Sequence, residues 1–204
     1  SRGLGDVYKR QGLDVSRHQQ NVDWEKVVEH EKPWFVFIKA TEGTLIVDPT
    51  YDRHRRELER TDVTWGAYHF FGHRTPGREQ ARNFIRTARL EKGNLLPVLD
   101  IEQHRFMTDP KRSVREAKAF CDEIRRYYGA DPIIYCSTHF YETYLKKEFS
   151  PDRYTLWIAD YRGCPRIKWR IWQHTDSHSL PGIRGKVDRN VFAGSEQEFK
   201  KLIL

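Results

Sequence analysis

Short apolar runs alternate with amphipathic stretches along this chain from residue 12 onward. Each run has the length of a strand and is bounded by polar or turn-forming residues, which is typical of buried strands. The pattern predicts strands at 13–16, 35–40, 64–70, 95–101, 132–137, 155–159, 170–173 and 187–192. Between the first six runs the apolar residues recur with a helical period, which predicts helices at 23–30, 49–60, 76–90, 113–128 and 138–148.

Start signals support two of these helices. Thr75-Pro76 precedes the helix at 76–90, and Ser113 followed three residues later by Glu116 predicts a capping box at the start of the helix at 113–128. After Tyr161 the helical period disappears, and only one more helix is predicted, at 195–204.

Alternating strands and helices indicate parallel strands joined by crossover helices. About eight strands in 204 residues predict an α/β fold, an abridged (β/α) barrel whose helices are missing after the later strands. An open doubly wound sheet is the alternative. We expect a single catalytic domain at 12–204. Residues 1–11 show no apolar period and are interpreted as a non-native or disordered tail, with a mobile native tail as the alternative.

Composition narrows the class of protein. The formal net charge of +7 suits an anionic partner such as nucleic acid, a membrane surface or a cell-wall polymer, or simply a solvated basic surface. No apolar stretch approaches the roughly 18 residues that span a bilayer, and the N-terminus has no apolar signal-peptide core. Three cysteines without a CxxC pair exclude a dense disulfide framework and a four-cysteine zinc site.

Several common chemistries lack their motifs. The chain has no GxxxxGK[ST] phosphate loop, no GxGxxG turn, no HExxH and no GxSxG elbow, and its nine histidines form no metal-type helical pair. We therefore expect no nucleotide cofactor and no metal.

Two carboxylates follow the apolar run at 95–101. Asp100 and Glu102 are two positions apart, so on a strand their side chains share one face, with α-carbons about 6.7 Å apart. The carboxyl ends of barrel strands are where catalytic groups are built. Neighbouring acids push their pKa values apart, so one can hold a proton while the other stays ionised, as cleavage of a glycosidic bond requires. The alternative is a loop cap at Asp100 and a surface ion pair at Glu102.

Further acids and aromatic residues lie at other strand ends. Asp14 ends the first predicted strand and Asp188 lies in the last, and a closed barrel would bring these two strands together. Aromatic rings pack on the apolar faces of sugars, although each ring could equally fill the core. Such rings stand at the strand ends or beside them: Tyr68, Tyr135, Trp157, Tyr161 and Trp172.

An ordered set of short motifs resembles glycoside hydrolase family 25, the Chalaropsis-type lysozymes or N-acetylmuramidases. The resemblance runs over residues 12–199 and rests on Gly12-Leu13-Asp14-Val15-Ser16 with Gln19 and Asp23-Trp24, Phe37-Ile38-Lys39-Ala40-Thr41-Glu42-Gly43, Gly66-Ala67-Tyr68-His69-Phe70, Leu99-Asp100-Ile101-Glu102, Pro132-Ile133-Ile134-Tyr135-Cys136-Ser137, Leu156-Trp157-Ile158-Ala159, Trp172-Gln173 and Val187-Asp188-Arg189-Asn190.

The resemblance implies a monomeric enzyme outside the cell or in its envelope that cleaves the β-1,4 bond between N-acetylmuramic acid and N-acetylglucosamine in the glycan strands of peptidoglycan. It implies no nucleic-acid partner and no membrane insertion. The catalytic acids would be Glu102, Asp100, Asp188 and Asp14, and the substrate-binding aromatics Tyr68, Tyr135, Trp157 and Trp172.

Two choices stay open. The cleavage could be substrate-assisted with Asp100 orienting the 2-acetamido group, or it could be inverting with Asp188 or Asp14 as base. The alternatives in function are a chitinase-like hexosaminidase and a non-catalytic cell-wall-binding module. The basic Arg17-His18-Gln19 loop is expected to alter the preference for substrate side chains.

Overall fold

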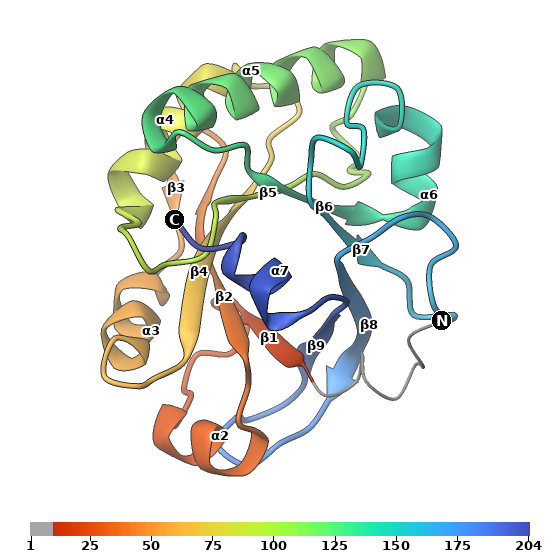
Figure 1. The fold of residues 1–204 in the computed structure, drawn as a ribbon. Helices are drawn as coiled ribbons and strands as arrows, with labels where there is room; N and C mark the ends of the chain where they lie inside the picture. The colour runs from red at the N-terminus through yellow and green to blue at the C-terminus, as the bar shows by residue number, and fades with distance from the viewer. Residues whose placement is uncertain (1–9) are drawn as a thin grey trace.

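The computed structural model describes residues 10–204, which form a closed barrel of eight strands with helices packed on its outside (Figure 1). The barrel strands are β1 (Gln11–Val15), β2 (Phe35–Glu42), β4 (Thr64–Phe70), β5 (Val98–Asp100), β6 (Ile133–Ser137), β7 (Leu156–Ala159), β8 (Ile171–His178) and β9 (Val187–Phe192). Pairing of β1 with both β2 and β9 closes the sheet. The abridged barrel is therefore confirmed and the open sheet is wrong.

One strand runs against the others. β1, β2 and β4–β8 are parallel neighbours, whereas β9 pairs antiparallel with both β8 and β1. The start of β9 therefore lies beside the carboxyl ends of the parallel strands. A two-residue strand that the apolar pattern did not predict, β3 (Ile46–Val47), forms a hairpin with the end of β2.

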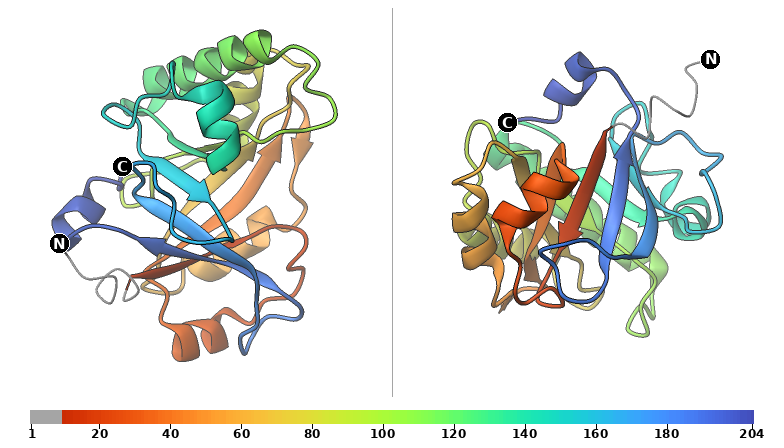
Figure 2. Two further views of the ribbon diagram at one scale, coloured as in Figure 1. Left: turned by 90° about the vertical axis from the view of Figure 1, so that its right-hand side faces the viewer. Right: turned by 90° about the horizontal axis from the view of Figure 1, so that it is seen from below.

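Helices connect the early barrel strands, but no helix connects β7 to β8 or β8 to β9. α2 (Trp24–Glu31), α3 (Tyr51–Leu58), α4 (Gly77–Ala88) and α5 (Pro110–Tyr128) follow the early strands, and after β7 the connections are loops (Figure 2). The predicted loss of helices after the later strands is thus confirmed. α7 (Glu196–Lys200) packs Phe199 against Phe35 and Phe192 at the amino end of the barrel.

Two predicted helices are shorter than the pattern indicated. The segment 138–148 is a single turn of α-helix, α6 (Thr138–Phe140), followed by a π-helical turn, η1 (Tyr141–Leu145). After α7 the chain returns to the sheet, where the Leu96 N–H donates to the Leu202 carbonyl at 2.7 Å. The C-terminal residues after α7 therefore form backbone hydrogen bonds with the segment before β5, and the helix does not continue to residue 204.

The predicted capping box at Ser113 is wrong. α5 begins at Pro110, and Asp109 is its N-cap, accepting from the Arg112 N–H. Ser113 is already inside the helix and its hydroxyl donates to the Asp109 carbonyl. Glu116 instead accepts from the Gly77 N–H at 2.9 Å, linking α5 to α4.

The barrel interior is filled by alternate strand residues, as the two-residue period requires. Large rings occupy it because two glycines leave room: a Cβ on Gly12 would come within 2.2 Å of the Phe35 ring, and one on Gly66 within 3.0 Å of Phe37. The other buried members of this inner cluster are Leu95, Val98, Ile133, Trp157, Ile171, Phe192, Phe199 and Leu202. A second, larger core lies between the sheet and the helices.

The predicted tail falls mainly on residues outside the described part of the chain. β1 begins at Gln11, the last residue assigned to that tail, which pairs with Val191.

Candidate functional site

A cavity of about 190 Å³ opens at the carboxyl end of the parallel strands, above the apolar filling of the barrel. Its floor consists of residues that continue the inward-facing positions of the strands. It brings together the four predicted acids, three of the predicted aromatic residues and four further side chains: Asp14, Asp100, Glu102 and Asp188; Tyr68, Tyr135 and Trp157; Ser16, His18, Lys39 and Phe70.

The acids come from three strands or their ends. Asp100 is the last residue of β5, and Glu102 follows two positions later, as the spacing predicted. Asp14 on β1 lies directly opposite Asp188 on β9 in the antiparallel register. Because β9 runs antiparallel, its second residue reaches the same end of the barrel as the last residues of the parallel strands. The predicted meeting of the first and last strands is therefore confirmed.

Asp14 is held by two amide side chains. Its Oδ2 accepts from Gln173 Nε2 at 2.9 Å and from Asn190 Nδ2 at 2.8 Å. The Trp157 indole N–H donates to Asn190 Oδ1 at 2.8 Å. Asp14 is thus a fixed acceptor, with both of its amide donors buried.

Gln173 is also fixed by phenols. Its Oε1 accepts from the hydroxyl of Tyr135 at 2.8 Å and from that of Tyr161 at 2.7 Å. A carboxamide that accepts two phenolic protons must direct its amino group to Asp14. This arrangement joins Tyr135, Tyr161 and Asp14 into one hydrogen-bond network through Gln173.

The Asp14–Asp188 pair carries a proton at neutral pH. Burial and the nearby Asp14 charge raise the pKa of Asp188 to about 9. Burial also raises the pKa of Asp14, while the hydrogen bonds from Asn190 and Gln173 oppose that rise. The amide donors favour the anion at Asp14, so the shared proton resides on Asp188.

The Asp100–Glu102 pair carries a second proton. Burial raises the pKa of Asp100 well above its usual range, and the charge of Glu102 and a hydrogen bond to that residue raise it further. The same hydrogen bond lowers the pKa of Glu102, so without a ligand the shared proton lies on Asp100. Burial also raises the pKa of Glu102, and the Lys39 ammonium lowers the pKa of both carboxyls. Asp100 is nearly fully buried, whereas Glu102 is partly exposed at the cavity.

One oxygen of Asp100, Oδ1, is buried without a hydrogen-bond partner in the described part of the chain. A buried acceptor of this kind loses its interaction with water and gains nothing in return. It therefore suits a donor that arrives with a ligand.

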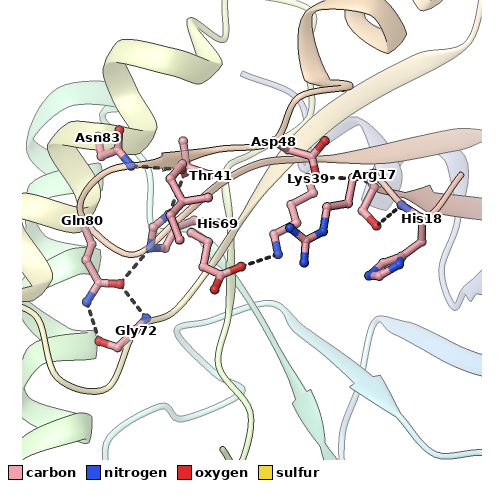
Figure 3. A network of polar contacts seen from close by, with 12 residues as sticks. Arg17, His18, Lys39, Thr41, Asp48, His69, Gly72, Gln80 and Asn83 are labelled. Atoms are coloured by element: carbon pink, nitrogen blue, oxygen red, sulfur yellow. Dashed lines mark hydrogen bonds and ion pairs between the residues drawn. The ribbon is translucent and has the colours of Figure 1, made fainter. Parts of the chain in front are cut away.

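Hydrogen bonds from behind the strand ends position this edge of the cavity. The His73 ring donates from Nε2 to the Glu102 carbonyl at 2.7 Å. Deeper, His69 accepts from the Thr41 hydroxyl at 2.7 Å and donates to Gln80 Oε1 at 2.9 Å, and Gln80 holds both backbone groups of Gly72 (Figure 3). Burial lowers the pKa of His69 to about 4, so this imidazole is neutral near pH 7.

The predicted aromatic residues separate into two groups. Tyr68 and Tyr135 line the cavity with Trp157, whose ring stacks on Phe37 with 4.8 Å between centroids. Trp172 does not line it: its neighbours on β8, Ile171 and Gln173, face the barrel interior, so its own side chain faces outward. There the Trp172 indole donates to the Asp160 carbonyl at 2.8 Å.

Three important side chains were not predicted as site residues: Lys39, Gln173 and Asn190. The two-residue period of the strand does indicate that Lys39 points inward, because Phe35 and Phe37 precede it at steps of two. The Lys39 ammonium pairs with Glu42 at 2.8 Å and lies 4.7 Å from the centre of the Phe70 ring. No local signal marks the two amides, since their roles depend on partners far away in the sequence.

Metal chemistry has no prepared site in the residues that the structure describes, where no three His, Cys, Asp or Glu side chains are grouped to hold an ion. Asp14 accepts hydrogen bonds from two amides, Asp188 is paired with Asp14, and Asp100 is paired with Glu102.

Comparisons with known proteins agree with this geometry. The family model of glycosyl hydrolases family 25 matches residues 13–183. The uncharacterized protein YegX of Escherichia coli O157:H7 is 34% identical over 96% of this chain and 74% of its own length. Lysozyme M1 of Streptomyces globisporus is 27% identical over 95% of this chain and 71% of its own. A solved family 25 glycosyl hydrolase from Bacillus anthracis superimposes with a TM-score of 0.87 and 30% identity, covering 96% of this chain and 94% of that one.

Proposed function

The chain belongs to glycosyl hydrolases family 25, and from that premise we propose that Glu102 is the general acid of a lysozyme reaction with Asp100 as its assistant. The protein is a glycoside hydrolase that degrades peptidoglycan as an N-acetylmuramidase. The bond cleaved is the β-1,4 linkage between N-acetylmuramic acid and N-acetylglucosamine.

The observation that carries the assignment is the Asp100–Glu102 pair at the cavity floor. The two carboxyls share a proton, and Glu102 is the more exposed of the two in the cavity. A substrate amide N–H that donates to the unpartnered Asp100 Oδ1 would favour ionised Asp100 and leave the proton on Glu102. Binding would thereby place the proton on the residue that must transfer it.

The reaction would proceed in two steps. Glu102 protonates the glycosidic oxygen as the C1–O bond breaks, and the oxygen of the 2-acetamido group forms a bond to C1, giving a cyclic cation. Asp100 accepts the acetamido N–H and stabilises the positive charge. Water then attacks C1, the ring of the cation opens, and Glu102 takes the proton from the water.

Glu102→Gln tests the acid. The amide keeps the shape of the carboxyl but has no proton to transfer, so lysis of purified cell walls should fall by about 10²–10⁴-fold. Glu59→Gln changes an exposed carboxyl directly after α3; it is the control and should keep full activity. Near-normal turnover in Glu102→Gln would reject the assignment.

The stereochemistry separates the two mechanisms. Inversion needs a free base facing water, but the proton of the Asp14–Asp188 pair lies on Asp188, and Asp14 is occupied by two amide donors. These features favour retention. Proton NMR of the first anomer released should show the β configuration of the substrate; an α product would establish inversion and exclude substrate assistance.

The partner and the location follow from the substrate. We expect the enzyme to act as a monomer on peptidoglycan glycan strands, outside the cell or in its envelope. Among the described residues, no helix combines the length and apolar character needed to cross a bilayer.

A further inference from the structure

A basic groove lies on the side of the barrel, away from the catalytic cavity. It runs between α5 and the turn formed by η1 and the residues after it, and encloses about 790 Å³. The two elements lie side by side in Figures 1 and 2. We call it the α5–η1 groove and define it by Lys111, Arg115 and Lys118 on α5 and by Lys146 and Lys147 after η1.

The cations of this groove are largely unpaired. Five lysine or arginine side chains line it against two acids, Asp122 and Glu148. Lys118 pairs with Glu148 at 2.5 Å. The other four cations have no carboxylate within ion-pair distance among residues 10–204, and all four are exposed. The groove therefore carries a net positive charge that ion pairs do not neutralise.

The cations form a line. Lys111, Arg115 and Lys118 follow one another at i, i+4 and i+7 on one face of α5, which spaces them by about 6 Å and then about 4.5 Å along the helix axis. Between them the floor is apolar, formed by Val114, Ala119 and the half-buried Tyr144. A row of charges along an open, shallow floor suits a linear chain that carries a charge in each repeat.

We propose that the α5–η1 groove binds a linear poly(alditol phosphate), with its phosphates on the cations and its carbon chain along the apolar floor. Phosphate is the anion that lysine and arginine side chains bind as point charges and forks. A single-stranded nucleic acid is disfavoured because sites of that class stack bases on several aromatic rings, and this groove offers only Tyr144.

The position of the groove suggests how polymer binding would assist hydrolysis. α5 begins eight residues after Glu102 and follows the carboxyl end of β5, so the Lys111 end of the groove is the end nearer the catalytic cavity. A wall polymer held there would keep the cavity close to the glycan. The inference goes beyond the proposed hydrolysis and does not depend on it.

Poly(glycerol phosphate) is the probe for the test, titrated against the full chain by calorimetry at low salt. The groove variant Lys111→Glu/Arg115→Glu/Lys147→Glu should bind at least tenfold more weakly than the wild type. The control Lys26→Glu/Lys92→Glu/Lys201→Glu changes the net charge equally at exposed lysines outside the groove and should bind within about threefold of wild type. Equal losses of affinity in both variants would overturn the proposal, because binding would then depend on net charge alone and not on the groove.

Two further measurements keep the result independent of folding and of catalysis. Amide NMR of the wild type with the polymer should shift signals of residues 110–122 and 143–148; shifts elsewhere, without these, would overturn the proposal. Poly(L-glutamate) should compete more weakly than poly(glycerol phosphate), and the reverse order would assign the groove to an acidic protein segment instead. Glu102→Gln should bind the polymer unchanged, which separates this proposal from the lysozyme assignment.

Discussion

Asn190 can present only its amino group to Asp14, because its carbonyl oxygen accepts the Trp157 indole N–H and an indole can only donate. Gln173 is constrained in the same way by two phenols. Asp14 therefore meets two fixed donors, and the proton that it shares with its neighbour stays on Asp188. At the scale of single residues, the acids of the site differ because their donors differ.

Lys39 shifts the pH range in which the Asp100–Glu102 pair, the proposed catalytic pair, keeps its proton. Its ammonium lowers the pKa of both Asp100 and Glu102, so Lys39→Met should raise both pKa values. The essential proton is then retained to higher pH, and the alkaline limb of the kcat/KM profile should move upward. The maximal rate should change far less than the about 10²–10⁴-fold expected for loss of the acid itself.

Lys39→Arg is the matched control, because it keeps the positive charge and should leave the alkaline limb in place. The readout is the pH profile on a soluble glycan, with a melting curve at each pH to show that the protein stays folded. An alkaline limb that stays fixed in Lys39→Met would mean that this limb reports another group.

The sequence predicts the site only where chemistry and spacing coincide. Asp100 and Glu102 are recognisable because two acids at a strand end share a face. Trp172 is aromatic and adjacent to that end, but its place in the two-residue period turns it to the outside of the barrel. The amides of Gln173 and Asn190 gain their roles from Asp14, 159 and 176 positions away, so no local spacing identifies them.

At the scale of elements, helix boundaries depend on competition between caps. Ser113 and Glu116 satisfy the capping-box pattern, but Asp109 followed by Pro110 offers an N-cap and a favoured first residue one turn earlier. The earlier start wins because it lengthens the helix, and Glu116 is then free to bind α4. The pattern of a full capping box is instead met at Ser195 and Glu198, at the start of α7.

Gly77 on α4 lies in close contact with the backbone of α5. A Cβ at this position would lie 1.7 Å from the Glu116 carbonyl oxygen, which belongs to the backbone and cannot rotate away. Gly77→Ala should therefore force the two helices apart and reduce the free energy of unfolding by about 1–3 kcal/mol. Thermal denaturation should show a lower Tm, by about 2–4 °C for each kcal/mol in a domain of this size.

Gly72→Ala is the control for this contact. Its nearest neighbour would be the Thr75 hydroxyl at 3.1 Å, a side chain that can move. A Tm for Gly77→Ala equal to that of the control would show that the α4–α5 packing adapts.

At the scale of the whole molecule, closure of the barrel is what assembles the site. The sequence predicts eight strands and the meeting of the first with the last, but the pattern of apolar residues does not encode direction. The reversal of β9 follows from the short β8–β9 connection that replaces a crossover helix. That reversal brings Asp188, near the start of its strand, opposite Asp14. The short β8–β9 connection therefore explains both the absence of a helix between these strands and the position of Asp188 in the site.

The distribution of charge predicts how salt acts on the enzyme. The chain carries a formal charge of +7, yet its cavity contains four acids and one lysine, so the positive excess lies outside the site. Attraction between exposed charges and a polyanionic wall is screened over about 8 Å at physiological ionic strength. The buried acids are shielded from bulk ions, and their proton sharing depends on burial and short contacts. Raising salt should therefore weaken lysis of intact cells much more than cleavage of a short, soluble, uncharged glycan. Parallel rate measurements on the two substrates across a salt series check this, and equal losses would place the effect of salt in the cavity and not on the basic surface.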